Sequence, residues 1–226
     1  MNIAITGKTG ILTSELQRLD STIISLSSNE YDISKFSIIK MLDEINFDTL
    51  IHAGAITNSS LIKDAPLNAI QTNIIGTAYL SQYCLLNNKR LVYISTDYVY
   101  PGDTGNYHES DPILPHNEYA WSKLGGECSV KLVPNHLIIR TSFGADNYPY
   151  EYAWDNLITS KDYVDIITPK IYKASLSNLT GILNIGTEPK SIHNYATRRS
   201  VVDKSQLEHS KNFSLNLEKY EQIFTN

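Results

Sequence analysis

The chain has 226 residues, with a hydrophobic fraction of 42% and a charged fraction of 19%, which suits one α/β domain or one such domain with a small appendage. A net charge of −5 argues against nucleic acid as the main partner, because phosphate binding needs a basic face. No stretch approaches ~18 consecutive apolar residues and the first residues lack the features of a signal peptide, so we expect no membrane span and a cytoplasmic protein.

Strands and helices alternate from the first residues to Arg140. Short apolar runs predict buried strands at residues 2–6, 22–26, 49–53, 90–95 and 136–140. Apolar residues at helical spacing predict four helices between and after them: one after Gly10 that buries Leu12, Leu16 and Leu19, one capped by Ser34, one from Pro66 to Leu85 that buries Ile70, Ile74, Ala78 and Tyr79, and one over residues 119–132. This alternation predicts right-handed crossovers and a parallel sheet with helices on both faces.

The pattern loosens beyond Arg140. We expect a tyrosine-rich loop over residues 143–154, helices over residues 152–160 and 169–176, a late strand over residues 181–185 and a last short helix over residues 217–224. In a doubly wound fold, an irregular region of this kind is expected over the carboxyl ends of the strands, where ligands bind. We therefore predict that it forms a short substrate-facing cap.

The segment Thr6–Ile11 joins the first strand to the first helix and contains two glycines. Gly7 would allow a tight bend, and Gly10 would let the backbone approach a pyrophosphate at the helix N-terminus. A P-loop needs a glycine where Asn2 stands, so that interpretation fails. An ordinary strand–helix turn is the alternative, but the position between a buried strand and an amphipathic helix favours a bound dinucleotide.

Tyr119 and Lys123 lie four residues apart and therefore share a face of their predicted helix. Tyrosine normally titrates near ~10, and a neighbouring ammonium favours the phenolate, which makes the phenol a usable proton donor near neutral pH. Such pairs also occur on exposed helix faces without any catalytic role. Thr96 favours catalysis, because it ends the preceding strand, where its hydroxyl would meet the phenol; the alternative for Thr96 is capping of the strand end. Together these residues indicate a carbonyl reductase.

Weaker candidates surround these segments. Asp32 and Ile33 are positioned to contact an adenine, residues 54–56 a diphosphate or ribose, and Asn73 is a candidate for orienting the catalytic lysine; the alternative for all of them is ordinary loop or surface chemistry. Tyr98 either walls the pocket or packs within its strand. The six histidines are scattered without ligand spacing, so we expect no metal site.

In order and spacing, five segments resemble the extended short-chain dehydrogenase/reductases, and most closely their dTDP-4-dehydrorhamnose reductase branch: Thr6–Leu12, Asp32–Ile33, Ser95–Gly102, Tyr119–Glu127 and Arg140–Phe143. The resemblance implies an α/β fold with a Rossmann-type doubly wound parallel sheet. It implies an NAD(P)-binding domain over residues 1–142 and a reduced C-terminal substrate-binding region over residues 143–226. The implied reaction is NAD(P)H-dependent reduction of the 4-keto group of a nucleotide-linked 6-deoxysugar, in deoxysugar or polysaccharide precursor synthesis.

The resemblance also implies a role for each matching residue. Tyr119 would donate the proton, Lys123 would hold the nicotinamide ribose and lower the pKa of the tyrosine, and Thr96 would position the keto oxygen. The residues expected to contact the substrate are Thr96, Asp97, Tyr98 and Phe143. With the weaker candidates included, the residues expected to bind the cofactor are Gly7, Thr9, Gly10, Ile11, Leu12, Asp32, Ile33, Gly54, Ala55, Ile56, Asn73, Ser95, Tyr119 and Lys123.

Three features depart from that family. No acidic residue ends the second strand at Ser25–Ser28, where an aspartate would bind the adenosine ribose of NAD, so NADP is slightly favoured over NAD. The segment after Thr57 lacks an acidic cluster, and the cap is short. Two alternatives therefore stay open, a catalytically silent NADP-binding regulatory module and a sugar-nucleotide epimerase. A homodimer is the assembly we consider.

Overall fold

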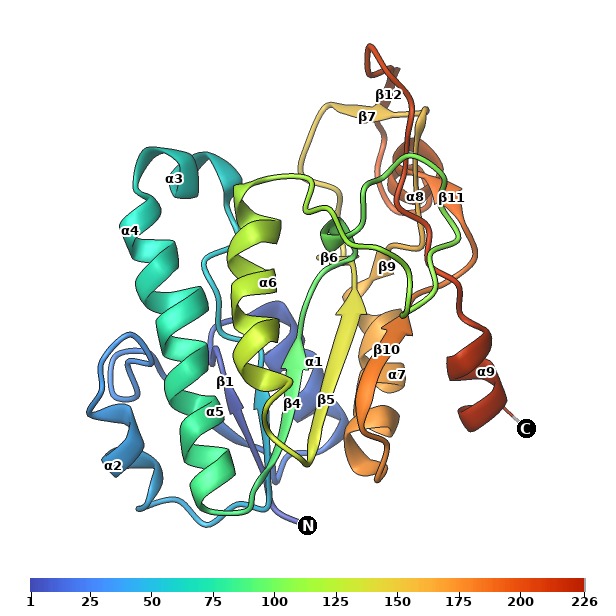
Figure 1. Cartoon of the computed structure of the whole chain (residues 1–226). Coiled ribbons are helices and arrows are strands. Elements are labelled where there is room, and N and C mark those ends of the chain that lie inside the picture. Colours follow the sequence, from blue (N-terminus) through green and yellow to red (C-terminus); the bar gives the residue numbers. More distant parts are fainter. Residues whose placement is uncertain (226) are drawn as a thin grey trace.

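The structure is a computed structural model that describes residues 1–225. Its main sheet consists, from one edge to the other, of β10 (Gly181–Ile185), β5 (His136–Thr141), β4 (Arg90–Ile94), β3 (Thr49–His52), β1 (Ile3–Thr6) and β2 (Ile24–Leu26). Neighbouring strands are parallel throughout, and helices lie on both faces (Figure 1). The doubly wound parallel sheet that the sequence predicts is confirmed.

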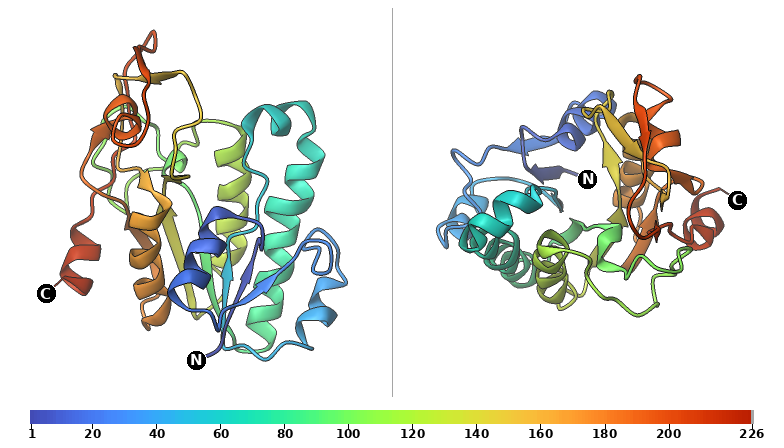
Figure 2. Two further views of the ribbon diagram at one scale, coloured as in Figure 1. Left: turned by 180° about the vertical axis from the view of Figure 1, so that it is seen from behind. Right: turned by 90° about the horizontal axis from the view of Figure 1, so that it is seen from above.

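Two separate cores cover the two faces of this sheet. The helices α1 (Ile11–Leu19) and α7 (Val164–Leu176) pack on one face, and α2 (Ile38–Leu42), α5 (Thr77–Leu86) and α6 (Glu118–Val130) pack on the other (Figure 2). In β1, Ile3 and Ile5 belong to the first core and Ala4 to the second. Successive side chains of a strand point to opposite faces, so a strand buried on both sides is apolar throughout.

The long helical stretch before α5 differs from the prediction. It includes α3 (Ser59–Asp64), which was not expected, α4 (Pro66–Ala69) and the π-helical segment η1 (Ile70–Gly76). The prolonged turn of η1 rotates the buried face, so Ile70 is 43% exposed while Asn73 is completely buried. At Gly76 a Cβ would lie 2.8 Å from the carbonyl oxygen of Ile33. The predicted apolar face is therefore wrong, because a close backbone contact and not the apolar spacing sets the helix rotation.

Two smaller expectations about helices also fail. The helix α2 begins only at Ile38 with Ser37 as its N-cap residue, because the hydroxyl of Ser34 donates to Asp32 at 2.6 Å within the preceding turn. In α1, Leu19 is 41% exposed although Leu12 and Leu16 are buried as predicted. The helix ends at Leu19, and Asp20 is its C-cap residue.

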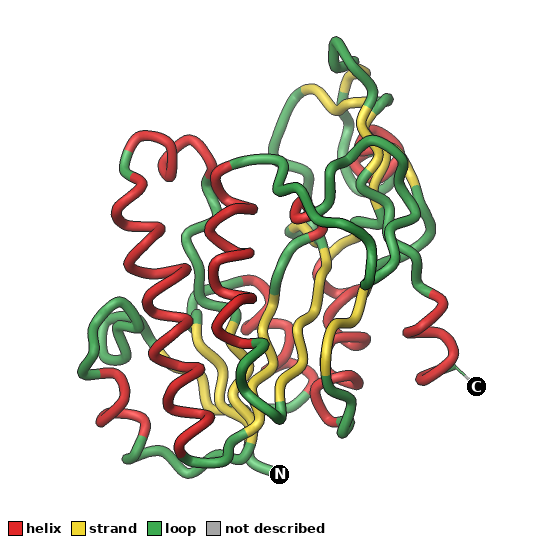
Figure 3. The backbone as a smooth tube through the Cα atoms, in the orientation of Figure 1, coloured by secondary structure: helices red, strands yellow, loops and turns green. Residues whose placement is uncertain are grey.

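Most of the C-terminal region lies over the carboxyl ends of the main strands, while its last helix lies beside β10 (Figures 1 and 3). Its elements are β6 (Phe143–Gly144), β7 (Tyr152–Trp154), β8 (Leu157–Thr159), β9 (Asp162–Tyr163), β11 (Lys190–Ser191), α8 (Ile192–Ala196), β12 (Asp203–Ser205), β13 (Lys211–Asn212) and α9 (Glu218–Phe224). The helix predicted over residues 152–160 is wrong. Burial alternates along β7 and β8, and their aromatic and β-branched residues favour strands. The late strand and the last helix are confirmed.

Residues beyond 142 also complete the main layers. They supply the edge strand β10, which pairs with β5, and the helix α7, whose Ile167 and Ile171 are completely buried in the same core as Leu16 of α1. The division into two domains at residue 142 stays a prediction. Within the described residues 1–225, no helix is long and apolar enough to cross a bilayer.

Candidate active site

The turn between β1 and α1 is shaped for close approach of a ligand. Gly7 has a φ of +87°, and a Cβ there would lie 3.0 Å from the Cα of Gly54, so glycine fits where other residues would be strained. The N–H of Gly10 donates to the carbonyl oxygen of Gly7 at 2.9 Å. Gly10 is also the N-cap residue of α1 and offers no side-chain cap. The first amide groups of α1 are thus available to an anion such as a diphosphate.

A continuous row of hydrogen bonds supports the loop after β3. The N–H of Gly54 donates to the hydroxyl of Thr6 at 3.0 Å, and that oxygen lies 2.7 Å from Nδ1 of His52. Nε2 of His52 lies 2.9 Å from Oγ1 of Thr77, which donates its only proton to the carbonyl oxygen of Asn73 at 2.7 Å. Nε2 must therefore carry the ring proton and Nδ1 must accept from Thr6. Burial holds the pKa of His52 well below its usual value, so the ring is neutral.

Asn73 connects this loop to the helix that carries Tyr119. Its amide exchanges two hydrogen bonds of 2.9 Å with the backbone of Ile56 and donates to the hydroxyl of Ser122 at 2.8 Å. Ser122 in turn donates to the carbonyl oxygen of Tyr119 at 2.7 Å. Asn73 is therefore placed to act on Lys123 through the neighbouring Ser122 and not by direct contact.

Thr96 and Asp97 form a buried polar pair where β4 ends and the short 3-10 helix η2 (Asp97–Val99) begins. Oγ1 of Thr96 accepts the N–H of Tyr98 at 3.2 Å, and its hydroxyl donates to Oδ1 of Asp97 at 3.2 Å. Thr159 donates to the other carboxyl oxygen, also at 3.2 Å. Burial raises the pKa of Asp97 to about 6, against the opposing effect of the Lys161 ammonium. Thr96 thus caps η2, and its hydroxyl must turn from Asp97 to meet a substrate oxygen.

Tyr119 and Lys123 lie on the first turns of α6. Asn117 caps this helix, because its Oδ1 accepts the N–H of Ala120 at 2.9 Å. Lys123 is only 2% exposed, and its Nζ lies 4.1 Å from the ring centroid of Tyr93, a distance at which the ring face attracts a cation. Tyr119 is partly exposed and lines the same groove as Lys123. The shared helix face that the sequence predicts therefore opens onto a cavity.

Burial is the largest cause of the pKa shifts of Tyr119 and Lys123. It lowers the pKa of Lys123 to about 7, while Glu127 acts in the opposite direction. It also raises the pKa of Tyr119, and the negative charge of Asp97 adds to that increase. The lowering of the tyrosine pKa by the ammonium stays a prediction. A protonated phenol beside a lysine that titrates near neutral pH suits proton donation.

A buried ion pair connects the elements that carry this site. Glu127 accepts from Nη2 of Arg140 at 2.8 Å and from Nε at 3.1 Å, and all these atoms are buried. The hydroxyl of Ser95 donates to the same carboxylate, and Arg140 also donates to the hydroxyl of Tyr100 at 3.0 Å. These contacts hold β4, β5 and α6 in one arrangement. Ser95 is expected to bind the cofactor, but its hydroxyl already donates its proton to Glu127.

All these elements meet in a groove of about 590 Å³. It lies where the strand order changes direction, between β1 and β3, which is the usual position of the ligand in open α/β sheets. The cofactor candidates that line it are Gly7, Thr9, Gly10, Ile11, Leu12, Gly54, Ala55, Ser95, Tyr119 and Lys123. The substrate candidates that line it are Thr96, Asp97, Tyr98 and Phe143.

Four predicted cofactor residues do not line this groove. Asp32 uses its carboxylate to accept the N–H and hydroxyl of Ser34. Ile33 packs in the core, and Ile56 and Asn73 support the loop from behind. Their contact with a cofactor stays a prediction.

Sequence reasoning missed other residues that line the groove: Thr13, Ala53, Thr57, Ser59, Ile94, Thr141, Ser142 and Lys161. Several follow directly from the ends of β3, β4 and β5, so strand boundaries alone could have indicated them. Thr141 is distinctive, because its buried hydroxyl oxygen has no hydrogen-bond partner within residues 1–225. Lys161 has no sequence signal, because it belongs to no motif and follows a segment predicted to be helical.

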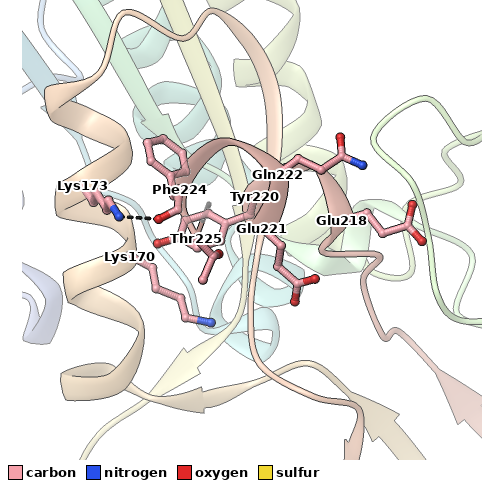
Figure 4. Close-up of a pocket in the computed structure, with 8 residues that line it drawn as sticks. All are labelled: Lys170, Lys173, Glu218, Tyr220, Glu221, Gln222, Phe224 and Thr225. Carbon is pink, nitrogen blue, oxygen red and sulfur yellow. Dashed lines mark hydrogen bonds between the residues drawn. The ribbon is translucent and has the colours of Figure 1, made fainter.

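A second hollow lies between α7 and α9, away from these residues. Figure 4 shows Lys170 and Lys173 of α7 facing the side chains of α9, and Lys173 donates to the carbonyl oxygen of Phe224. Its lining comes from these two helices and from Thr225, the C-cap residue of α9, and it contains none of the predicted site residues. Over residues 1–225, no three His, Cys, Asp or Glu side chains are grouped so that they could hold a metal ion.

The main sheet is doubly wound and parallel, and a Gly-rich turn lies where its strand order changes. A threonine, a tyrosine and a lysine lie near the carboxyl ends of its strands. Together these features define the class of short-chain dehydrogenase/reductases. The chain matches the family model for the RmlD substrate binding domain over residues 1–168. It therefore belongs to that family.

Curated relatives carry the names of sugar-nucleotide reductases. A dTDP-4-dehydrorhamnose reductase of Aggregatibacter actinomycetemcomitans is 28% identical over 179 residues, which cover 75% of this chain and 61% of that protein. A dTDP-4-dehydrorhamnose reductase of Mycolicibacterium smegmatis is 28% identical over 207 residues, which cover 84% of this chain and 63% of that protein. The chain thus spans less than two thirds of the length of both relatives.

Solved structures agree with the fold. A hypothetical dTDP-4-dehydrorhamnose reductase from Sulfolobus tokodaii superposes with a TM-score of 0.88 at 24% identity, covering 100% of this chain and 96% of that one. A dTDP-4-dehydrorhamnose reductase from Bacillus anthracis, in complex with NADP, also gives a TM-score of 0.88 at 24% identity, covering 99% and 92%. At this identity the likeness establishes the architecture alone.

Proposed function

We propose that the protein is an NADPH-dependent reductase of the 4-keto group of a nucleotide-linked 6-deoxysugar. The observation that carries this proposal is that Tyr119, Lys123 and Thr96 line the same groove as the turn at Gly7 and Gly10. A general acid and a dinucleotide site that share one cavity are the parts required for carbonyl reduction.

The protein's own residues would bind and orient the substrate and protonate its reacting oxygen. Bound NADPH would supply the hydride that adds to the carbonyl carbon. Tyr119 would give its phenolic proton to the resulting alkoxide oxygen, and the Lys123 ammonium would stabilise the phenolate left behind. Thr96, once its hydroxyl turns from Asp97, would donate to the keto oxygen and fix its position. A bulk proton then restores the phenol.

The chain fits a dinucleotide, and its features favour NADPH over NADH. The uncapped N-terminus of α1 and the left-handed turn at Gly7 provide room and amide donors for a diphosphate. The strand β2 ends at Leu26 beside this turn, since the N–H of Lys8 donates to Leu26 at 3.3 Å. The residues that follow are Ser27 and Ser28, which bring no carboxylate to repel a 2′-phosphate. The Bacillus anthracis relative with NADP bound is consistent with this preference.

A spectrophotometric assay tests the proposal. NADPH absorbance would be followed with a dTDP-linked 4-keto-6-deoxy sugar and wild-type protein, and compared with the Tyr119→Phe variant. We expect turnover that falls by roughly 10²- to 10⁴-fold in the variant, because a general acid contributes about that much. NADPH affinity should change little, and NADH should support slower turnover.

A matched variant, Tyr79→Phe, removes a hydroxyl far from the groove, on α5 beside Phe36, and should keep wild-type turnover. NADPH binding without turnover of any nucleotide sugar would contradict the proposal and would identify a regulatory binding module. Assembly into a homodimer stays a prediction.

A further inference from the structure

The C-terminal region brings one charged side chain to the groove. The charged residues in the groove lining are Asp97, Lys123 and Lys161, and Lys161 is the one without a role in the steps above. It lies between β8 and β9, in the C-terminal region. Because the C-terminal region is where the substrate is expected, Lys161 is a candidate for contact with the substrate.

The backbone of Lys161 is firmly connected to Asp97. Its N–H donates to Oγ1 of Thr159 at 3.1 Å, and Thr159 donates to Oδ2 of Asp97 at 3.2 Å. The carbonyl oxygen of Lys161 accepts from Nζ of Lys190 at 3.2 Å. The next residue, Asp162, is paired with Arg198 at 2.8 Å. The loop is thus anchored on both sides, which preorganises any site that it forms.

The course of the Lys161 side chain is also fixed. A Cβ on Gly144 would lie 3.2 Å from Cε of Lys161, so the aliphatic stem crosses close to that glycine. The Nζ atom lies 5.5 Å from the ring centroid of Tyr195. These contacts occupy the stem and one side of the ammonium, and Lys161 is among the residues that line the groove.

Asp97 and Lys161 attract each other without touching. The charge of each opposes the shift that burial causes in the pKa of the other, yet no ion pair within 4.0 Å joins them in the described chain. Two opposite charges that line one cavity but stay apart provide an acceptor and a donor for a group placed between them.

We propose that Lys161 is a specificity-determining residue that, together with Asp97, binds the hydroxyl on the carbon next to the reacting carbonyl. This inference rests on the proposed function. A hydroxyl both donates and accepts, so it matches a carboxylate and an ammonium at the same time. Asp97 follows Thr96 directly and accepts from its hydroxyl, so a group held by Asp97 is next to the oxygen held by Thr96. A carboxylate substituent at this place would be repelled by Asp97.

The test measures binding without turnover. Calorimetry in the presence of NADP⁺, which cannot deliver a hydride, gives the affinity of a dTDP-linked 4-keto-6-deoxyhexose for wild type and for Lys161→Met, which keeps the length of the stem. We expect affinity to fall roughly ten- to a hundredfold, as for loss of a charge-assisted hydrogen bond. The loss should shrink to about the uncertainty of the measurement, roughly twofold or less, with the 3-deoxy analogue, which lacks the hydroxyl. Lys131→Met, an exposed lysine at the end of α6, should bind both sugars as wild type does.

A second readout needs no sugar at all. Carbon-13 NMR of the Asp97 carboxyl, whose titratable neighbours are Lys161, Tyr98 and Tyr119, should show a higher pKa in Lys161→Met than in wild type. If Lys161→Met does not fold, Lys161→Gln takes its place.

The two proposals fail in different ways. Unchanged sugar affinity in Lys161→Met, or an equal loss with the 3-deoxy analogue, overturns this inference while wild-type turnover leaves the proposed function intact. Tight, Lys161-dependent binding of a sugar that NADPH does not reduce supports the inference and overturns the proposed function. Wild type that binds neither sugar overturns both.

Discussion

The buried position of Asp97 in the groove lowers the stability of the folded protein when its carboxyl group is ionised. It is 1% exposed and its partners are hydroxyl groups and a lysine at a distance. Burial raises its pKa to about 6, so folding favours the protonated acid. Its contribution to stability is therefore complete below its unfolded pKa and is lost as the pH rises through about 6. The carboxylate costs stability where the proposed enzyme would work.

The isosteric Asp97→Asn variant should reveal this cost, because an amide does not titrate. Relative to wild type, its free energy of unfolding should rise by up to about 3 kcal/mol between about pH 4 and about pH 8. Urea-induced unfolding at both pH values measures the difference. The exposed Asp64→Asn variant is the control. A stability difference for Asp97→Asn that stays level across this range would show that the carboxyl is not strained by burial.

The segment η1 is the element that joins the two sides of the groove. Asn73 lies at its centre and hydrogen-bonds both Ile56, in the loop after β3, and Ser122, next to Lys123. A regular α-helix would rotate Asn73 away from one of these partners. The π-helical turn is therefore part of the architecture of the site.

Replacing Asn73 by alanine removes three hydrogen bonds of a buried side chain and leaves the N–H of Ile56 without its acceptor. The free energy of unfolding should fall by about 2–4 kcal/mol, and NADPH should bind more weakly because the loop after β3 loses its support. Chemical denaturation and fluorescence titration with NADPH measure the two effects. Asn68→Ala on the exposed face of α4 should cost less than about 0.5 kcal/mol. A variant that loses stability but binds NADPH as wild type does would limit Asn73 to a structural role.

Local sequence patterns determine some of these elements and leave others to tertiary contacts. The central strands are buried on both faces, so each gives an apolar run, and Thr96 follows soon after the end of β4. The rotation of η1 was not predictable, because it depends on the contact between Gly76 and Ile33, which are far apart in the chain. The strands β7 and β8 have three residues each, which is too short for the sequence pattern to distinguish a strand from a helix over residues 152–160. Lys161 reaches the groove only through the tertiary arrangement of the C-terminal region.

At the scale of the whole molecule, the two parts of the chain are interdependent. The region after residue 142 supplies β10 to one edge of the sheet and α7 to the face shared with α1. Without it, β5 would become an exposed edge strand and the apolar surface of α1 would face water.

A chain ended after residue 142 should therefore fail to fold cooperatively, although it retains the turn and the Tyr119/Lys123 pair. Near-ultraviolet circular dichroism and NMR dispersion of the fragment, measured beside the full chain, provide the test. We expect a fragment with little fixed tertiary structure that aggregates at micromolar concentration. A fragment with dispersed spectra and NADPH affinity would instead establish residues 1–142 as an independent domain.

The row of hydrogen bonds through His52 has a definite polarity. It starts at a peptide amide, which can only give a proton, and finishes at a peptide carbonyl, which can only receive one. Reversing any single link would force the others to reverse, and the two ends do not allow it. The imidazole is thereby restricted to one tautomer and excluded from proton shuttling, and burial and the Lys123 charge both keep it neutral by lowering its pKa.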